Sequence, residues 1–355
     1  MTTDFIPDDL LEDLRELAVA QERPGGTAEP AYRRMAEAGV TTWKIPVEYG
    51  GTGRTSTEMM SGYEALGAEN LSAAFVLTQL NAAVSLLGAS DNEALRADLL
   101  PKFASAEQFS TVGISHFSTS RQHLKKPAVT LEERDDGFAF SGMLPWCTGA
   151  GLADLVLAGG ELPDGRQALA FLELDAPGVT VIPPPQLLAL TPSATTSIKL
   201  DNVLVPFERV VKGPLKDVLS QRSGPTGSIG TSALAVGHAK GTLRGLAGEA
   251  GKRPDLVATL DVLESERAAL SADIRTITLV PQDQRPEELN PIPIRARANS
   301  LCLRAAQSYL TASKGAGFVA GHAAGRFVRE SLFFQVWSCP GPVAAAALRE
   351  FSCGL

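Results

Sequence analysis

The chain has 355 residues, of which 44% are hydrophobic and 20% charged, and its formal net charge is −8. These values are typical of a folded protein of two or three domains, and the negative charge argues against nucleic acid as the main partner. No apolar run reaches the roughly 20 residues of a membrane span, and the acidic N-terminus is unlike a signal peptide. The four cysteines are scattered without a CxxC pair, so no metal site is expected. We therefore expect a cytoplasmic protein that binds neither a membrane nor nucleic acid.

The first third of the chain has the periodicity of helices. Apolar residues recur three and four positions apart over 4–22, 29–39, 57–88 and 91–105. The segment 57–88 is apolar on nearly every side, which predicts one long buried helix, and Asp91 is predicted to cap the helix after it. Residues 1–108 are therefore predicted to form a helical N-terminal domain.

The pattern changes to short β-type segments at Phe109 and returns to helices after Pro214. Seven runs rich in Val, Phe, Ile and Thr, separated by turn signals, predict a middle antiparallel β-barrel domain over 109–212. Four long helical segments then predict an up-and-down bundle over 213–355, with helices at 228–250, 254–279, 292–313 and 323–337. The predicted fold class is α+β and mostly α.

The stretch Ser141–Gly160 is the main candidate for a functional site. Trp146 and Thr148 lie two positions apart at the end of a β-type run, so the indole and the hydroxyl are predicted on the same face of a strand. One side chain can then lie against a flat ring while the other hydrogen-bonds the edge of that ring. The stretch is a candidate cofactor platform, and the alternative is a buried Trp at an ordinary strand end.

Six short motifs follow one another along nearly the whole chain. They are IPVEYGG (45–51), LLPKFASAEQFSTVGIS (99–115), the strand pair from Gly137 to Thr148, DNVLVP (201–206), GAGF (315–318) and RFVRES (326–331). Together with the order of helices, strands and helices, they resemble the motifs of the acyl-CoA dehydrogenase family of flavoproteins. The resemblance implies that family's fold, with a helical N-terminal domain, a middle β-barrel and a C-terminal four-helix bundle.

The resemblance also implies a cofactor, FAD, and the residues that bind it. In the family the flavin lies between the β domain and the bundle, with an indole and a hydroxyl against its ring. A glycine turn in the bundle meets the FAD of a neighbouring subunit, since a missing Cβ suits close approach to a phosphate. The matching residues, with the arginine of the "R-D" pair included, are Val112, Ile114, Ser115, Trp146, Thr148, Gly315 and Arg329.

The family's catalytic glutamate is absent from its usual place. In family dehydrogenases this glutamate removes the α-proton of an acyl-CoA and stands in "Y-E-G-T". Here Trp337 matches the tyrosine, and Ser338 matches the glutamate. Serine cannot replace it, because taking a proton from carbon needs a base whose pKa can be tuned towards neutrality. Ser338 therefore occupies the catalytic position, and a relocated base would be Glu330 or Glu249.

Two loops near the implied cofactor site also depart from the family. The "T-E-P-x-x-G-S-D" loop reads SHFSTSR (115–121), with His116 in place of the glutamate. The "R-x-x-F-G" loop, which grips the FAD of a partner subunit, is replaced by GEAGKRPDL (248–256). His116 is a second candidate catalytic residue, although a lone histidine in a loop is more often a structural hydrogen-bonder.

Three functions remain open for this sequence. The first is an FAD-dependent oxidoreductase that does not desaturate acyl-CoA and instead performs flavin monooxygenase-type chemistry, for which no carboxylate base is needed. Ser115, His116 and Thr148 would then be the polar groups nearest to flavin N5. The second is a non-catalytic or half-site subunit of a heteromeric acyl-CoA dehydrogenase. The third is an acyl-CoA dehydrogenase with a relocated base.

The expected partners are a small-molecule substrate and further protein subunits. An acyl thioester is one substrate class that the resemblance allows. The segments 228–250 and 292–313 carry more apolar and small residues than the interior of one bundle needs. A homodimer or homotetramer through the bundle is therefore expected, or a heteromer with a homologous subunit under the second function.

Overall fold

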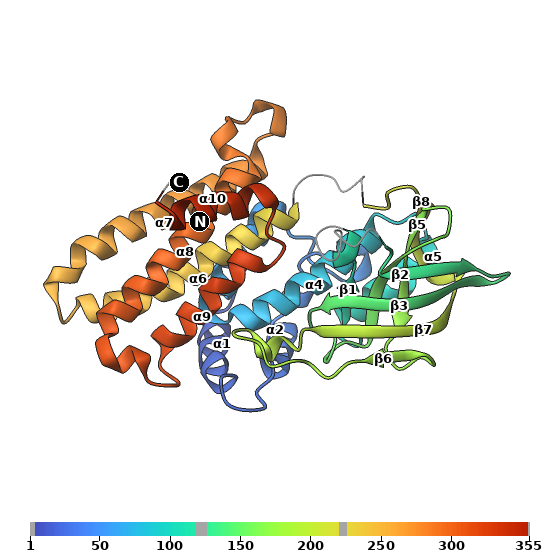
Figure 1. Cartoon of the computed structure of the whole chain (residues 1–355), viewed down its shortest axis with the longest axis horizontal. Helices are drawn as coiled ribbons and strands as arrows, with labels where there is room; N and C mark the ends of the chain where they lie inside the picture. The colour runs from blue at the N-terminus through green and yellow to red at the C-terminus, as the bar shows by residue number, and fades with distance from the viewer. Residues whose placement is uncertain (1–3, 118–125, 220–225, 354–355) are drawn as a thin grey trace.

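The computed structural model describes residues 4–117, 126–219 and 226–353. Along these residues a group of helices comes first, then a β-sheet, then a second group of helices (Figure 1). In that view the C-terminal bundle lies on the left and the sheet on the right. The predicted fold class, with a helical domain, a β domain and a helical bundle in that order, is confirmed.

The N-terminal helices differ from the prediction in two places. They are α1 (Asp8–Ala20), α2 (Glu29–Glu37), α3 (Ser56–Glu69), α4 (Leu71–Gly88) and α5 (Glu93–Ala104). The single helix expected over 57–88 is wrong, because Asn70 is extended and its side-chain oxygen accepts the backbone N–H of Ala73. An asparagine in this position satisfies a donor of a new first turn, so it begins α4. For the same reason Asn92, whose side chain accepts the N–H of Leu95, caps α5 in place of Asp91.

Helix α4 runs through the middle of the molecule, between the bundle and the sheet (Figure 1). By length and composition it is apolar enough to cross a membrane, and it is the one such helix in the described ranges, but 72% of it is buried inside the fold. Burial on all sides accounts for an apolar helix in a folded domain. Because of its position, α4 can contact both the strand ends and the bundle.

The middle region is one eight-stranded sheet. Its strands are β1 (Ser110–Gly113), β2 (Val129–Glu133), β3 (Gly137–Cys147), β4 (Leu155–Glu161), β5 (Gln167–Glu173), β6 (Val179–Val181), β7 (Thr196–Pro206) and β8 (Val210–Leu215). The order is β6-β7-β3-β2-β4-β5-β8, and β1 pairs with β4. The purely antiparallel pattern in the prediction is wrong, since β1 and β4 run parallel. The β2–β3 hairpin lies between them in the chain and supplies the crossover that a parallel pair requires.

The C-terminal part contains the four predicted bundle helices and a short fifth one. These are α6 (Thr226–Ala250), α7 (Val257–Leu279), α8 (Pro291–Ser313), α9 (Ala323–Val336) and α10 (Gly341–Phe351). Helix α6 packs closely on α3, because an added Cβ at Gly237 would lie 2.2 Å from the carbonyl oxygen of Glu64. One hydrophobic cluster therefore runs from the N-terminal helices through the bundle to one face of the sheet. A second cluster fills the interior of the sheet region.

Candidate active site

The ends of β1 and β3 meet beside α4 and are tied together by two hydroxyl groups. The Ser115 Oγ donates to the carbonyl oxygen of Pro145 over 2.8 Å. The Thr111 Oγ1, which is fully buried, donates to the carbonyl oxygen of Thr148 over 2.5 Å. These bonds bring the sequence-predicted residues of the two strands, Val112 to Ser115 and Trp146 to Thr148, to one place in the structure.

Trp146 and Thr148 do not share a strand face as the spacing predicts. The register of β3 against β7 shifts between Leu144 and Cys147, and Trp146 has a φ of +56°. This left-handed conformation breaks the alternation of side chains, because alternation requires extended backbone. The Trp146 indole is therefore 50% exposed, whereas Thr148 is fully buried. The Thr148 Oγ1 accepts a hydrogen bond of 3.0 Å from the hydroxyl of Thr195.

Strand β1 provides polar backbone groups close to the end of β3, to which Ser115 and Thr111 bond. Among the described strands, β1 pairs with β4 alone, although Ser110 and Thr111 are fully buried. The carbonyl oxygen of Thr111 already accepts a hydrogen bond of 3.1 Å from the Ser110 hydroxyl. Buried backbone N–H and C=O groups require partners, so the other polar groups of the second edge of β1 can receive a group with its own donors and acceptors. A flavin has such a polar edge next to a flat apolar face. A strand edge with polar backbone groups and a half-exposed indole nearby in the chain are features that a flavin fits.

His116 lies directly after β1 in the short 3₁₀ turn η3 (Ser115–Phe117). Its ring packs against Phe117, with the two ring centroids 4.4 Å apart. Phe117 in turn presses on β4, where an added Cβ at Gly159 would lie 2.3 Å from the Phe117 ring. The structure thus places His116 at the end of β1, as the sequence predicts. The remaining residues of the SHFSTSR loop, 118–121, lie outside the described residues.

Helix α4 connects this strand end to the segment that holds Ser338. On one side, an added Cβ at Gly149 would lie 3.4 Å from Val76. On the other side, the ring of Phe75, the residue before Val76 in α4, meets the Trp337 ring edge to face, with the two ring centroids 4.6 Å apart. Ser338 follows directly, is exposed and has a φ of +41°. A positive φ costs roughly 1 kcal/mol or more for a residue with a Cβ, so neighbouring contacts must hold it.

The two carboxylates considered as relocated bases lie elsewhere in the bundle. Glu330 is buried, with its Oε2 3.4 Å from Nε2 of His238, while Nδ1 of His238 lies 2.9 Å from Sγ of Cys302. Burial raises the pKa of Glu330, but Arg326 and His238 more than offset this, so the pKa lies below its ordinary value. Glu249 lies in the last turn of α6, 3.5 Å from the ammonium of Lys252. Neither carboxylate is placed beside Ser338 by any of these contacts.

The two bundle residues of the implied cofactor site are separate from the strand ends. Gly315 lies in the exposed turn η10 (Lys314–Phe318), where an added Cβ would meet no atom within 4 Å. Arg329 forms an ion pair with Glu22, just after α1. In a single subunit, therefore, neither residue contacts the strand-end site. Within the described ranges, no group of three or more His, Cys, Asp or Glu side chains is placed to hold a metal ion.

Two residues behind the Trp337 segment do not stand out in the sequence analysis. The Asn299 Nδ2 donates to the carbonyl oxygen of Phe334 over 2.8 Å, and the Arg295 Nη2 donates to that of Trp337 over 3.1 Å. Both side chains are buried in the bundle. Arg295 and Asn299 are four positions apart, which places them on the same side of α8.

Comparison with known proteins agrees with this architecture. Residues 1–107 match the model of the acyl-CoA dehydrogenase N-terminal domain. Isobutylamine N-hydroxylase from Streptomyces viridifaciens is 28% identical over 218 residues, and the match spans 59% of this chain and 57% of that protein. A probable acyl-CoA dehydrogenase of Bacillus subtilis, YngJ, is 22% identical over 95% of this chain and 93% of its own length.

Solved structures show the same fold over nearly the full length. The complex of TdsC from Paenibacillus sp. A11-2 with FMN and indole matches with a TM-score of 0.81 at 18% identity, and the match covers 98% of this chain and 95% of TdsC. The N-terminal domain model, the full-length relative and the arrangement of helices, sheet and bundle all point to one family. The chain thus has an N-terminal domain of the acyl-CoA dehydrogenase type and, over nearly its full length, the fold of these flavoproteins.

Proposed function

We propose that this protein is a flavin-dependent oxidoreductase that does not desaturate acyl-CoA and performs monooxygenase-type chemistry. The single observation that carries the proposal is the segment after α9, where Trp337 and Ser338 stand in place of the family's tyrosine and catalytic glutamate. The similarity to an N-hydroxylase supports it, as does the fold of TdsC, which was solved with FMN and indole.

The flavin would lie between the strand ends and the bundle. Trp146 would cover its face, and the backbone around Val112 and Ile114 would bond its polar edge, with Ser115 close to the same edge. A bound flavin in its reduced form would supply the two electrons with which molecular oxygen places one oxygen atom in the substrate and releases the other as water. The role of this chain is to orient the ring and the substrate and to exclude bulk water from the reacting atoms.

The missing base gives the first test. A base must come within about 3 Å of the proton it removes, directly or through one water. We expect no bleaching of the enzyme-bound flavin by straight-chain acyl-CoA under anaerobic conditions. Ser338→Glu should recover weak reduction at best, and Ser338→Gln, which adds the same length without a base, should recover none. Rapid anaerobic bleaching of the wild-type flavin would overturn the proposal.

A second test addresses the oxygen chemistry. With chemically reduced flavin, molecular oxygen and a primary amine or indole as probe, the products are analysed by mass spectrometry. The proposal predicts a product that is heavier by one oxygen atom and that carries the label when ¹⁸O₂ is used. Complete uncoupling, with hydrogen peroxide as the only product for every probe, would favour the non-catalytic subunit instead.

The choice between FAD and FMN is tested by titration of the protein with each. The family resemblance favours FAD, whereas the replaced "R-x-x-F-G" loop removes a contact to the part of FAD beyond the flavin. Trp146→Ala should weaken binding of either cofactor by roughly 3–10-fold, because an aromatic stacking contact contributes about 0.5–1.5 kcal/mol. The matched control is Phe207→Ala, another exposed aromatic at the far end of β7, which should leave binding unchanged.

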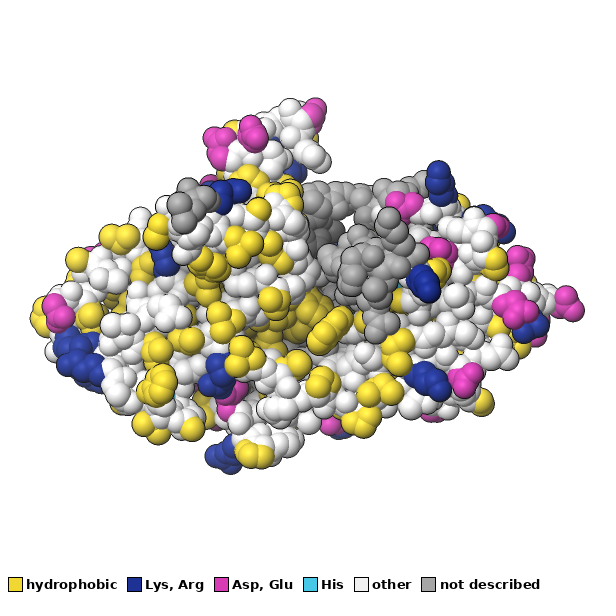
Figure 2. All heavy atoms as spheres, in the orientation of Figure 1, with side chains coloured by type: hydrophobic (Ala, Val, Ile, Leu, Met, Phe, Trp, Pro, Cys, Tyr) yellow, Lys and Arg dark blue, Asp and Glu magenta, His cyan; other side chains and the backbone are white. Residues whose placement is uncertain are grey.

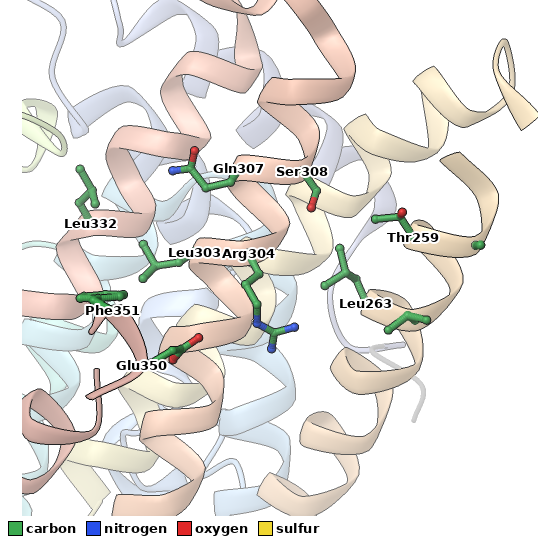
Figure 3. A pocket seen from close by; sticks show the side chains of 11 residues that line it. Thr259, Leu263, Leu303, Arg304, Gln307, Ser308, Leu332, Glu350 and Phe351 are labelled. Atoms are coloured by element: carbon green, nitrogen blue, oxygen red, sulfur yellow. The ribbon is translucent and has the colours of Figure 1, made fainter. Parts of the chain in front are cut away.

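We also propose that the protein assembles through the outer face of its bundle. A groove of about 910 Å³ lies between α7, α8, α9 and α10, and Leu263, Leu303 and Phe351 are among its lining residues (Figure 3). Hydrophobic side chains cover much of the bundle half of the face in Figure 2. Val262, which lines the groove, and Leu348 of α10 are each 66% exposed. In oligomeric proteins, exposed apolar surface of this kind is commonly covered by a neighbouring subunit.

Light scattering tests the assembly. The wild type should be a dimer or a tetramer at micromolar concentration, and Leu348→Asp should shift it towards the monomer. Val19→Asp is the matched control, since Val19 is 55% exposed on α1, outside the bundle. A wild-type monomer would contradict homo-oligomer formation. Assembly only after a homologous dehydrogenase subunit is added would point to the heteromer.

A further inference from the structure

Arg295 is a fully buried arginine near the start of α8. Its Nε donates to the side-chain oxygen of Asn299 over 2.8 Å, and its Nη2 donates to the carbonyl oxygens of Phe334 at 3.3 Å and Trp337 at 3.1 Å. Asn299 completes the arrangement through its own bond to Phe334. All of these backbone acceptors belong to the last turn of α9 and the residue after it.

No carboxylate pairs with this guanidinium among the residues that the structure describes, and Nη1 finds no hydrogen-bond partner there. Burial lowers the pKa of Arg295 to about 10, which still leaves the side chain charged at neutral pH. A buried cation without an anion is destabilising. Part of the cost is offset by the C-terminal end of α9, where the unpaired carbonyls carry partial negative charge. An apolar side chain of similar size would make the folded protein more stable if this position served packing alone.

The segment that Arg295 holds is the one that lies against α4. Trp337 stacks on Phe333, with ring centroids 5.8 Å apart and an interplanar angle of 21°, and meets Phe75 of α4 edge to face. The next residue, Ser338, has the unfavourable φ of +41°. The hydrogen bond to the Trp337 carbonyl therefore fixes the peptide group that directly precedes this strained residue.

We propose that Arg295 is the positioning residue for the substrate side of the site, holding the Trp337–Ser338 segment so that the indole forms a rigid aromatic wall against Phe75. The inference rests on the proposed function, because that function places the substrate beside this segment. It also assigns a chemical preference. Phe333 and Trp337 at the end of α9 are partly exposed, and the buried Phe75 of α4 packs behind them. The two partly exposed rings suit a compact or aromatic substrate, with which they can stack, better than a long flexible acyl chain.

The test labels the three tryptophans of the chain with 5-fluorotryptophan and records ¹⁹F spectra of the protein without flavin. Trp337→Phe identifies the Trp337 signal. In Arg295→Met, which removes the charge and every donor, we expect the Trp337 signal to shift and broaden while the Trp43 and Trp146 signals stay. Arg295→Lys keeps the charge and one donor nitrogen and should move the signal less. Arg297→Met is the control, because Arg297 lies on the same helix but pairs with Asp273 over 2.7 Å.

An unmoved Trp337 signal in Arg295→Met would overturn the inference. If Arg295→Met does not fold, the spectrum of Arg295→Lys is the test, and a Trp337 signal unchanged from the wild type in that variant would overturn the positioning role of Arg295. The proposed function fails separately, since it predicts that flavin shifts the Trp146 signal of the wild type. Should flavin bind, an indole probe should bind Arg295→Met about 3–10-fold more weakly than the wild type, as the loss of one oriented aromatic contact implies, and Arg295→Lys should weaken binding less. Equal binding would exclude the substrate-side role.

Discussion

Replacing Gly237 by alanine tests the close packing of the N-terminal helices on the bundle. The new Cβ would lie 2.2 Å from the carbonyl oxygen of Glu64 in α3. That oxygen belongs to the backbone of a helix and cannot rotate away, so the two helices must separate by about 1 Å to reach ordinary van der Waals contact.

The expected magnitude combines two opposing effects. Overpacking costs about 3 kcal/mol when the obstacle is rigid, and the better helix propensity of alanine returns about 1 kcal/mol. Gly237→Ala should therefore lower the free energy of unfolding by roughly 2 kcal/mol. Gly248→Ala on the same helix is the matched control. Its Cβ would meet nothing within 4 Å, so it should raise the free energy of unfolding by about 0.5–1 kcal/mol.

Urea unfolding followed by far-UV circular dichroism measures both variants against the wild type. Opposite signs for two identical substitutions on one helix are the decisive result, because propensity alone would stabilise both. If Gly237→Ala is as stable as Gly248→Ala, α3 and α6 do not pack at the described distance, and the argument from close approach is refuted.

Three further predictions concern stability and reactivity. Arg244 and Arg15 donate hydrogen bonds to Glu69, and these bonds outweigh burial and lower the pKa of Glu69 from the ordinary 4.5. The ionised Glu69 therefore stabilises the folded protein fully above pH 4.5, and this stabilisation is lost as pH falls through the pKa of the folded state. Glu69→Gln should flatten the acid limb of a plot of melting temperature against pH. Asn70→Ala removes the cap of α4 and should cost about 1 kcal/mol in urea unfolding, whereas an unchanged midpoint would show that the cap is dispensable. In a thiol titration at pH 8, exposed Cys353 should react at once. Buried Cys147 should react only after denaturation, because burial raises its pKa to about 12. Fast modification of Cys147 in the native protein would disprove its burial.

The sequence predicted most helices and strands because each has a regular period along one buried face. It failed where one residue changes the local backbone. Nothing in the apolar pattern of 57–88 reveals that Asn70 is extended, since its neighbours on both sides are equally suited to a helix. β8 was missed because it contains Pro214, which reads as the end of a domain.

At the site, residue types were easier to predict than directions. The motif resemblance brought Ser115 and Trp146 to the strand ends that the structure ties together. The direction of Thr148 could not be predicted, because it depends on a register shift in β3 that only the pairing with β7 determines. Arg295 could not be recognised as buried, because arginine is ordinarily a surface residue and its acceptors lie about 40 positions later in the chain.

The shared core of the N-terminal helices and the bundle has a consequence for synthesis on the ribosome. Glu69 bonds to Arg244, which is synthesised 175 positions later. Thr57 bonds to Thr278, which is synthesised 221 positions later. At 5–20 residues per second, the first of these delays lasts roughly 10–35 s. During that time α3 and α4 lack the surface that covers them, so the nascent N-terminal third should expose apolar side chains and bind chaperones. We expect a fragment of residues 1–108 to aggregate when expressed alone and to become soluble when the bundle is supplied as a second chain.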